Sequence, residues 1–441
     1  MVIDNNITEK QQVNYQFKIL YAIGMIIVVA NHGPVTCSIF YEFFPAYSFH
    51  MGLFVFCSGY FYKEIYENNP GKYVLKKVKT LIIPLYLWNC VYALVAQLLS
   101  IRGFEFGIGV SVQQLLFLPL YNGHQYMYNL PTWFIAPLFM VEVFNVFYRK
   151  VLFLFKGYIK EIIYFSFAFV LGMLGIYLSV HGHNVGWGLA VTRWLYFVPF
   201  YCGGFFYKKV LEKKFNSIPS VIYLLGILFL ELVIIYKRNG AIEWIQSWSE
   251  FWEFNAWPFV VGFLGIAFWL RIAYILEPAI GRSKVVNLIA DNTFSIMTNH
   301  LIGFIIIKSV FAFFNSNVYG KFTDFDWVAY HTDIEYCYYP KGIEAIGLVY
   351  IVTGIALSIL IQKMIDKIKH LLEERFELVN TNLGKALIYV MVIIMTVAPA
   401  KWIANNVENL SKIEANAGIY IVDDGEDMTG LPFTMRQDKV V

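Results

Sequence analysis

Long apolar stretches alternate with short polar connections along nearly the whole chain. Many of these stretches are about twenty residues long, the length that a helix needs to cross a hydrocarbon core of about 30 Å. Helices satisfy their own backbone hydrogen bonds, so helices are the expected spans. We predict an all-α, polytopic transmembrane helical bundle of about ten to eleven spans. The candidate spans are residues 18–33, 48–65, 80–101, 131–148, 161–180, 190–207, 218–236, 255–275, 286–314, 344–362 and 385–403.

Composition supports a membrane protein. Hydrophobic residues make up 58% of the 441 positions and charged residues only 15%, whereas an average soluble protein carries about 25% charged residues. So few charges cannot cover the surface of a soluble chain of this length. The cysteines are far apart and form no CxxC pair. Cys37 and Cys337 are in a position to meet in the outer connections, but the sequence does not pair them.

Lysine and arginine concentrate in every second connection, at 63–79, 149–160, 208–214, 282–284 and 363–385. Because cytoplasmic connections are enriched in these residues, we predict a cytoplasmic N-terminus. Residues 1–17 lack the basic start and cleavage site of a signal peptide, so the first span is expected to start insertion. The expected parts are a cytoplasmic N-terminal segment 1–17, a membrane domain 18–365, a cytoplasmic linker and extra transmembrane helix 366–404, and an acidic extracytoplasmic tail 405–441.

The connections between the basic ones have a different character. They are residues 34–47, 102–130, 181–189, 237–254 and 315–343, and they are rich in Tyr, Trp, Asn, Gly and His. Aromatic faces stack on apolar sugar faces while amides and carboxylates bind hydroxyl groups. The alternative is the aromatic belt that any membrane protein has at its interfaces, and the sequence leaves both interpretations open.

The first span carries a polar stripe that ends in a histidine. His32 lies at its outer end, where Gly33 and Pro34 should stop the helix. Tyr21 is about 20° from His32 around the helix and about 16 Å along it, and Lys18 is about 40° from that face. Ionisable groups inside a span are costly, so these residues are functional candidates. The alternative is a histidine that caps the helix and binds local carbonyls.

A second candidate cluster lies around the second and third spans. His50 belongs to the second span, and Lys76 and Lys79 precede the third. Lysines at a cytoplasmic helix entrance can bind the phosphates of a nucleotide-bearing donor. The competing explanation is the positive charge that cytoplasmic connections carry near lipid headgroups. Ser58 and Gly59 allow a close approach of another helix.

The ninth span has a polar stripe of its own. Asn292, Ser295 and Asn299 are spaced i, i+3 and i+7, and His300 follows directly. A stripe of this kind must face other helices or a cavity, because lipid cannot satisfy it.

Several catalytic motifs are missing from the sequence. It contains no GxxxxGK[ST] loop, which excludes a P-loop ATPase, and no GxSxG elbow of the α/β-hydrolases. It also lacks the His-x₄-Asp pattern of glycerolipid acyltransferases. His181 and His183 form a His-x-His pair without further ligands at suitable spacing, so we predict no metal site.

Taken together, these segments resemble the acyltransferase-3 family of bacterial integral membrane acyltransferases. The resemblance covers roughly residues 15–365 and rests on the order and spacing of several motifs, none of which is specific by itself. The segments that carry it are residues 28–32, 49–60, 76–88, 133–139 and 291–300.

The resemblance implies transfer of an acyl group from cytoplasmic acyl-CoA to an acceptor at the outer face, often a hydroxyl of a surface polysaccharide. It implies His32 as the catalytic base or acyl relay, a role that is typically worth 10²–10⁴-fold in rate. Acyl-CoA, most simply acetyl-CoA, is the expected co-substrate, with no permanently bound cofactor. The expected donor-binding residues are Lys76, Lys79, Lys18 and Tyr21, and the expected substrate-binding residues are His50, Trp133, Asn299 and His300.

One departure from the family concerns the first span. The family usually has Arg or Lys eleven residues before the histidine, where this chain has Tyr21. Lys18 lies one turn away and has a long side chain that can replace the missing cation. The alternatives are an altered donor path or a loss of catalysis.

We therefore expect a membrane O-acyltransferase in a bacterial cell membrane. Its expected partners are acyl-CoA, a surface glycan or lipid-linked sugar, and membrane lipid; nucleic acid is not among them, and a homo-oligomer is possible. The main alternative is a transporter, exporter or flippase of a glycan, although the sequence shows no convincing paired half-repeats. A glycan polymerase is a third interpretation, but the outer connections are short for one and contain few arginines.

Overall fold

The computed structural model describes residues 13–33, 41–107, 109–152, 155–317, 324–341, 343 and 345–416. Cys37 and the acidic tail from residue 417 lie outside these ranges. The described part is helical, apart from two isolated β-bridges. The α-helices are α1 (Tyr15–Asn31), α2 (Ala46–Tyr60), α3 (Pro70–Lys77), α4 (Ile83–Ser100), α5 (Leu118–Tyr121), α6 (Ile135–Val151), α7 (Gly157–Val180), α8 (Trp187–Phe206), α9 (Glu212–Asn216), α10 (Ser220–Arg238), α11 (Trp257–Ile280), α12 (Lys284–Asp291), α13 (Thr293–Asn317), α14 (Trp327–Thr332), α15 (Ile346–Arg375) and α16 (Asn382–Asn416).

Among the described residues, 8 helices are long and apolar enough to cross a membrane, and α1 is a shorter apolar helix. The 8 segments are Pro70–Ser100, Met127–Val151, Gly157–Val180, Ser220–Arg238, Trp257–Ile280, Thr293–Ser316, Ile346–Arg375 and Asn382–Val407. The chain is therefore a multi-pass helical membrane protein. The two remaining expected spans, 48–65 and 190–207, coincide with α2 and α8, so the total of ten to eleven stays a prediction.

Helix α1 occupies the interior of the bundle. Its first turn is capped by Asn14, whose side chain accepts a 3.0 Å hydrogen bond from the Phe17 amide. It packs against α2, α11, α12, α13 and α15. The helix ends at Asn31, and the Gly33 amide donates to the Ala30 carbonyl 3.0 Å away. His32 therefore stands at the C-terminal end of the helix, as the sequence predicted.

The third span is one long helix with a widened segment. Helix α3 continues through a π-helical turn at Val78–Ile82 into α4. Pro84 has no amide to donate to the carbonyl four residues earlier, and π-turns are a common response to such an interruption.

Helices α2 and α8 approach each other more closely than most helix pairs. A Cβ atom added at Gly59 would lie 1.9 Å from the Tyr201 carbonyl oxygen, and one added at Gly204 would lie 1.9 Å from that of Phe56. Neither glycine can be replaced without moving backbone. The close approach expected at Ser58 and Gly59 is confirmed, and it holds α2 firmly in the bundle.

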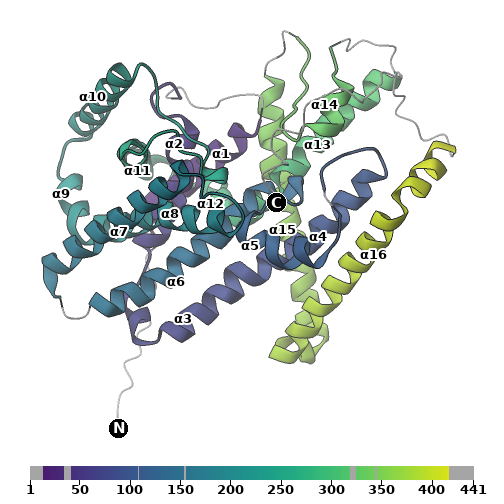
Figure 1. The fold of residues 1–441 in the computed structure, drawn as a ribbon, viewed down its shortest axis with the longest axis horizontal. Helices are drawn as coiled ribbons and strands as arrows, with labels where there is room; N and C mark the ends of the chain where they lie inside the picture. Colours follow the sequence, from purple (N-terminus) through teal and green to yellow (C-terminus); the bar gives the residue numbers. More distant parts are fainter. Residues whose placement is uncertain are drawn as a thin grey trace.

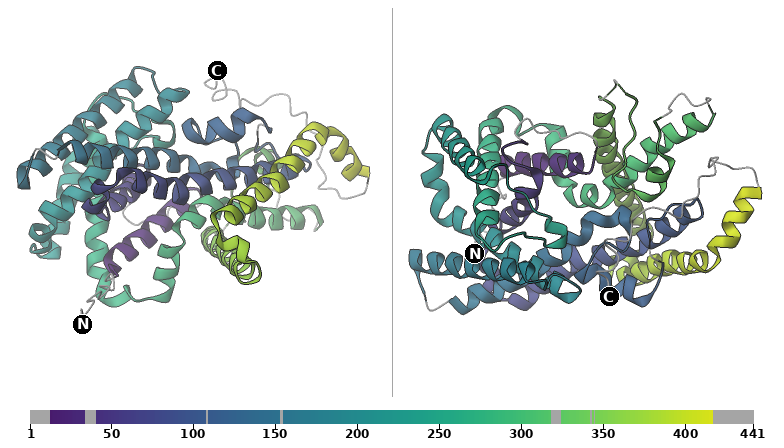
Figure 2. Two further views of the ribbon diagram at one scale, coloured as in Figure 1. Left: turned by 90° about the horizontal axis from the view of Figure 1, so that it is seen from below. Right: turned by 45° about the horizontal axis from the view of Figure 1, so that its top comes forward.

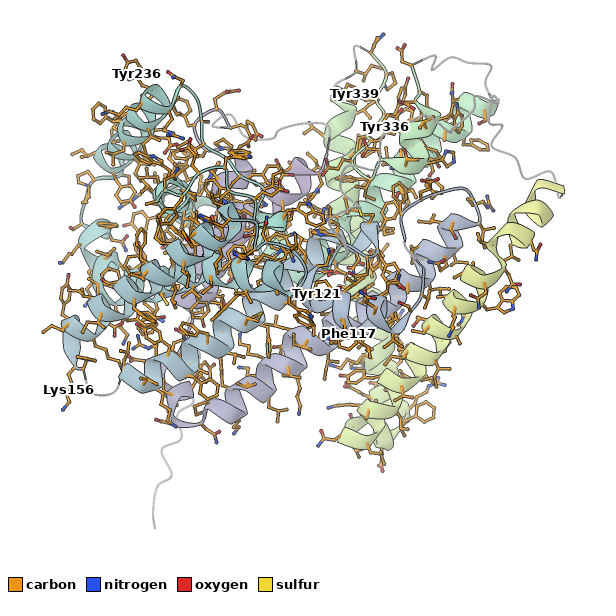
Figure 3. All side chains as sticks on the ribbon, in the orientation of Figure 1. Phe117, Tyr121, Lys156, Tyr236, Tyr336 and Tyr339 are labelled. Carbon is orange, nitrogen blue, oxygen red and sulfur yellow. The ribbon has the colours of Figure 1, made fainter. Side chains whose placement is uncertain are left out.

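The connections reach opposite edges of the molecule. In Figure 3, Tyr236, Tyr336 and Tyr339 lie at the upper edge, whereas Lys156 lies at the lower left. This arrangement agrees with the alternation of basic and aromatic connections in the sequence. Helix α16 lies along α4 at one side of the bundle (Figures 1 and 2), and only 11% of its most apolar stretch is buried.

Candidate functional site

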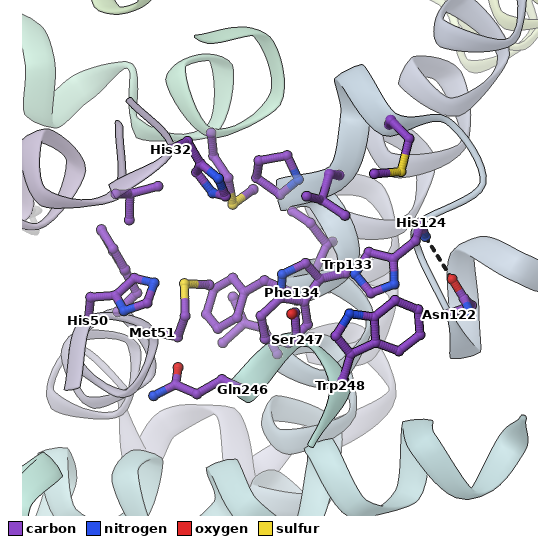
Figure 4. A pocket seen from close by; sticks show the side chains of 18 of the residues that line it. His32, His50, Met51, Asn122, His124, Trp133, Phe134, Gln246, Ser247 and Trp248 are labelled. Carbon is purple, nitrogen blue, oxygen red and sulfur yellow. Dashed lines mark hydrogen bonds between the residues drawn. The ribbon is translucent and has the colours of Figure 1, made fainter. Parts of the chain in front are cut away.

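A cavity of about 750 Å³ lies within the bundle, between α1, α2, α13 and the segments around residues 122–142 and 245–248. Figure 4 shows part of its lining, including His32, His50, Trp133 and Trp248. The volume is within the range of roughly 300–1,000 Å³ that is usual for sites that bind small molecules.

Helix α1 supplies one wall of this cavity. The lining includes Tyr21, Met25, Val28 and His32, which are spaced by four, three and four residues and therefore share one face of the helix. The predicted common face of Tyr21 and His32 is thus present, and it is turned toward the cavity. Lys18 is not part of the lining; it forms an ion pair with Asp291.

His32 lies between a carboxylate and a second imidazole. Its Nδ1 atom is 3.6 Å from Oε1 of Glu335, and its side chain is 15% exposed. The ring centroid of His300 is 5.3 Å from that of His32. With Nδ1 directed at Glu335, the Nε2 atom of His32 is the nitrogen that remains for a substrate. An imidazole that faces the cavity therefore has a carboxylate within ion-pair distance, without a hydrogen bond between them among the described residues.

The other predicted substrate-binding residues divide into two groups. His50 and Trp133 line the cavity, and Figure 4 shows His50 below and to the left of His32. One ring nitrogen of His50 contacts the Ala46 carbonyl. Asn299 and His300 lie outside the lining, and both are buried.

Asn299 and His300 have mainly structural contacts. The hydroxyl of Tyr92 in α4 donates a 2.9 Å hydrogen bond to Oδ1 of Asn299. Nδ2 of Asn299 donates to the Ser295 carbonyl at 3.0 Å. The Nδ1 atom of His300 is 2.8 Å from the Ile296 carbonyl one turn earlier. Among the described contacts, the one that links His300 to the cavity lining is the contact of its ring with the ring of His32.

One end of the cavity contains a compact cluster of paired polar groups. Nζ of Lys77 donates to Oε1 of Glu142 at 2.6 Å, and Oγ of Ser58 donates to the same oxygen at 2.6 Å. Glu142 is 1% exposed, so its charge needs these partners. Tyr21 lines this part of the cavity as well. We call Tyr21, Ser58, Lys77 and Glu142 the Lys77 end.

The two lysines predicted to hold the donor point elsewhere. Lys76 and Lys79 are exposed and lie outside the cavity lining. Nζ of Lys76 stands 5.5 Å from the centroid of the Tyr66 ring, a cation–π distance. Lys77, between them in sequence, is the lysine that faces inward.

The opposite end is built from connections rather than from helix interiors. The rings of His124 and Trp248 are 4.2 Å apart, and Gln246 and Ser247 line the cavity beside them. Three carboxylate residues that also come from connections, Glu105, Asp333 and Glu335, line the cavity as well. We call these seven residues the Trp248 end.

Two buried cations hold the Trp248 end together. Arg193 donates to the carbonyls of Tyr121, Asn122 and Ser247, and its guanidinium lies 4.8 Å from the Trp133 ring centroid. Lys308 is fully buried, and its Nζ donates to the Asp333 carbonyl at 3.2 Å. This bond fixes the connection that brings Glu335 to His32.

Sequence reasoning missed three residues of this site. Glu142 had a clear signal, because it is the one acidic residue in the predicted span 131–148. Lys77 could not be separated from Lys76 and Lys79, because the basic positions surround the helix. Glu335 had no signal, because its contact with His32 crosses most of the chain length. Within the described ranges, no cluster of three or more His, Cys, Asp or Glu could hold a metal ion.

Comparison with known proteins identifies the family. The family model described as an acyltransferase domain, acyltransferase 3, matches residues 14–363. Comparisons with curated proteins and with solved structures gave no match. The matched range covers most of the chain, including His32 and both ends of the cavity. The chain therefore belongs to the acyltransferase 3 family and is a membrane-bound acyltransferase.

Proposed function

We propose that this protein transfers an acyl group, most simply acetyl from acetyl-CoA, to a hydroxyl of a cell-surface polysaccharide or its lipid-linked precursor in a bacterial cell membrane. The observation that supports the proposal most is the position of His32. It lines a cavity that extends to the Lys77 end and to the aromatic, carboxylate-bearing Trp248 end, and its Nδ1 atom is 3.6 Å from Glu335.

In the proposed reaction, Nε2 of His32 accepts the proton of the acceptor hydroxyl. The hydroxyl oxygen attacks the carbonyl carbon of the thioester, the carbon–sulfur bond breaks, and the leaving thiolate takes the proton from His32 as CoA thiol. Glu335 stabilises the positive charge that His32 carries between these proton transfers. In the alternative order, His32 itself carries the acyl group before the hydroxyl attacks it.

The donor is proposed to enter at the Lys77 end. Lys76 and Lys79 are exposed beside Lys77, where they can bind the diphosphate and leave the adenine nucleotide outside. The pantetheine arm then passes Tyr21 and the apolar face of α1 to reach His32, roughly 16 Å away along the helix. In this chain Tyr21 accommodates the arm, and the inward-facing cation is Lys77 from α3.

The proposed orientation follows from the basic connections. The Lys77 end adjoins the connection 63–79, one of the lysine-rich set, and the Trp248 end is formed by connections that are rich in aromatic residues. With a cytoplasmic N-terminus, the donor enters from the cytoplasm and the acceptor from the outer face.

The decisive experiment measures transfer of radiolabel from acetyl-CoA in membranes of a host that makes its native surface glycan. Wild-type protein should place base-labile label in the glycan, and His32→Ala should reduce the rate at least about 100-fold at equal protein level. His370→Ala is the matched control, because His370 is exposed on α15 and forms an ion pair with Glu374 there.

Two results would contradict the proposal. The first is full transfer by His32→Ala, which would remove His32 from the chemistry. The second is no transfer by wild-type protein from several acyl-CoAs. A glycan that still crosses the membrane in that case would favour transport instead.

A further inference from the structure

The two ends of the cavity differ in the balance of positive and negative side chains that line them. At the Lys77 end the lining holds one lysine and one glutamate, and they are bonded to each other. At the Trp248 end the described lining holds the carboxylates of Glu105, Asp333 and Glu335 and no lysine or arginine. All three carboxylate residues are exposed.

The cations near the Trp248 end either donate to backbone carbonyls or lie outside the cavity lining. Arg193 is 1% exposed and donates to three backbone carbonyls. Lys308 is fully buried and donates to the Asp333 carbonyl. Arg102 is exposed, but it lies outside the lining. Among the described residues of this end, the charge that faces the cavity is therefore negative.

Backbone contacts hold the three carboxylates near one another. The Glu105 amide donates to the His331 carbonyl at 3.1 Å, which joins the connection after α4 to the last turn of α14. The Glu335 amide donates to Oδ1 of Asp333 at 2.8 Å. Glu335 also approaches His32 at 3.6 Å, so one of these carboxylates stands next to the place where an acceptor hydroxyl has to stand.

We propose that the sugar unit that enters the Trp248 end and receives the acyl group carries no negative charge. This inference rests on the proposed acyl transfer and names its acceptor class: neutral or amino-bearing sugars rather than uronic, sialic or phosphorylated ones. A concave site lined by one sign of charge repels ligands of that sign. An acceptor carboxylate would also compete with Glu335 for His32.

The same residues suit the hydroxyls of an uncharged sugar. Carboxylates and the amide oxygen of Gln246 accept hydrogen bonds and therefore bind hydroxyl donors. The Gln246 oxygen is buried without a hydrogen-bond partner among the described residues. Trp248 adds an aromatic face for the apolar side of a sugar ring.

The charge of the site can be measured without knowing the acceptor. Ser247→Cys places a thiol in the lining, and its reaction rates with a cationic trimethylammonium-ethyl and an anionic sulfonatoethyl methanethiosulfonate are compared. After division by the rates of a free thiol, the cationic reagent should react at least about tenfold faster. Added salt should bring this ratio closer to one, because salt screens the charges of the cavity.

Matched controls isolate the carboxylates and the native thiols. Asp333→Asn with Glu105→Gln should bring the ratio toward one. The experiment uses a Cys37→Ser background, and the same protein without Ser247→Cys is the blank. Cys57, Cys90 and Cys202 are buried, and burial raises the pKa of the Cys337 thiol to about 12, so it reacts slowly. An anionic reagent that reacts as fast as the cationic one overturns the inference.

The second measurement locates the acyl group. In membranes of the native host, base-labile label from acetyl-CoA should be found by mass spectrometry on a neutral or amino sugar. Label on a uronic, sialic or phosphorylated sugar overturns the inference and leaves acyl transfer standing. Absence of label from every glycan with several acyl-CoAs counts against acyl transfer itself, and the reagent ratio then still decides the charge preference of the cavity.

Discussion

The two ends of the cavity handle charge in opposite ways. At the Lys77 end, Glu142 is 1% exposed and its oxygen accepts two hydrogen bonds, from Lys77 and Ser58. At the Trp248 end, Glu335 is 54% exposed and approaches His32 at 3.6 Å. The first end is built from helix interiors and the second from connections.

Buried and exposed charged residues are expected to contribute to different properties of the protein. A buried pair gives modest net stabilisation, yet removal of one partner lowers the free energy of unfolding because it leaves the other charge uncompensated. An exposed carboxylate contributes little to stability. We therefore expect substitutions at the Lys77 end to affect folding first, and substitutions at the Trp248 end to affect the reaction first.

The largest effect is expected for Lys77→Met, because it leaves the Glu142 carboxylate buried with Ser58 as its remaining partner. The free energy of unfolding should fall by about 3–5 kcal/mol, measured by denaturation in detergent. Adding Glu142→Gln should recover most of the loss. Lys79→Met is the control, since Lys79 is exposed, and its effect should stay within about 0.5 kcal/mol. A Lys77→Met protein as stable as wild type would show that the pair does not matter to folding.

A smaller effect, on catalysis, is expected for Glu335. Glu335→Gln removes the charge but keeps a polar oxygen near Nδ1 of His32, and Glu335→Ala removes both. The 3.6 Å separation is an ion-pair distance, and loss of about 1.4 kcal/mol of electrostatic stabilisation of the protonated His32 would lower kcat about tenfold. The order of kcat should be wild type, Glu335→Gln, Glu335→Ala, with unchanged unfolding. Equal kcat in all three proteins would separate Glu335 from the reaction.

The smallest effect is expected for Lys18→Met. Lys18 is paired with Asp291, and their side chains are 24% and 59% exposed. An exposed pair of this kind is worth about 0–1 kcal/mol. Lys18 lies outside the lining, so KM for acyl-CoA should change less than about fivefold. This limit corresponds to about 1 kcal/mol of binding free energy. A larger increase in KM would restore Lys18 to the donor site that the sequence suggested.

Much of the fold could be predicted from the sequence, because the membrane leaves few choices for an apolar segment. Helices stand at each of the expected spans, although the ninth, 286–314, is divided at Asn292 into α12 and α13, and α1 ends beside His32. The same-face argument for Tyr21 and His32 succeeded because it depends on one helix alone. The close approach at Gly59 was also readable, since only a residue without a side chain fits there.

Contacts between distant segments were beyond sequence reasoning. Asn299 was expected at the substrate, yet it binds Tyr92 of α4. Its polar stripe had to face either a helix or a cavity, and periodicity does not distinguish the two. The inward position of Lys77 depends on where Glu142 of α6 lies, and the approach of Glu335 to His32 depends on the bond from Lys308 to Asp333. Each of these requires the packed bundle.

A cavity of about 750 Å³ encloses roughly one drug-sized molecule. In the proposed reaction, that space has to hold the thioester end of the donor together with the attacking hydroxyl. A long glycan therefore presents one unit per visit, and its neighbours in the chain stay outside. The density of acyl groups along such a polymer would then follow from how often each unit visits the site, compared with how fast the chain grows or is exported, rather than from a pattern stored in the enzyme.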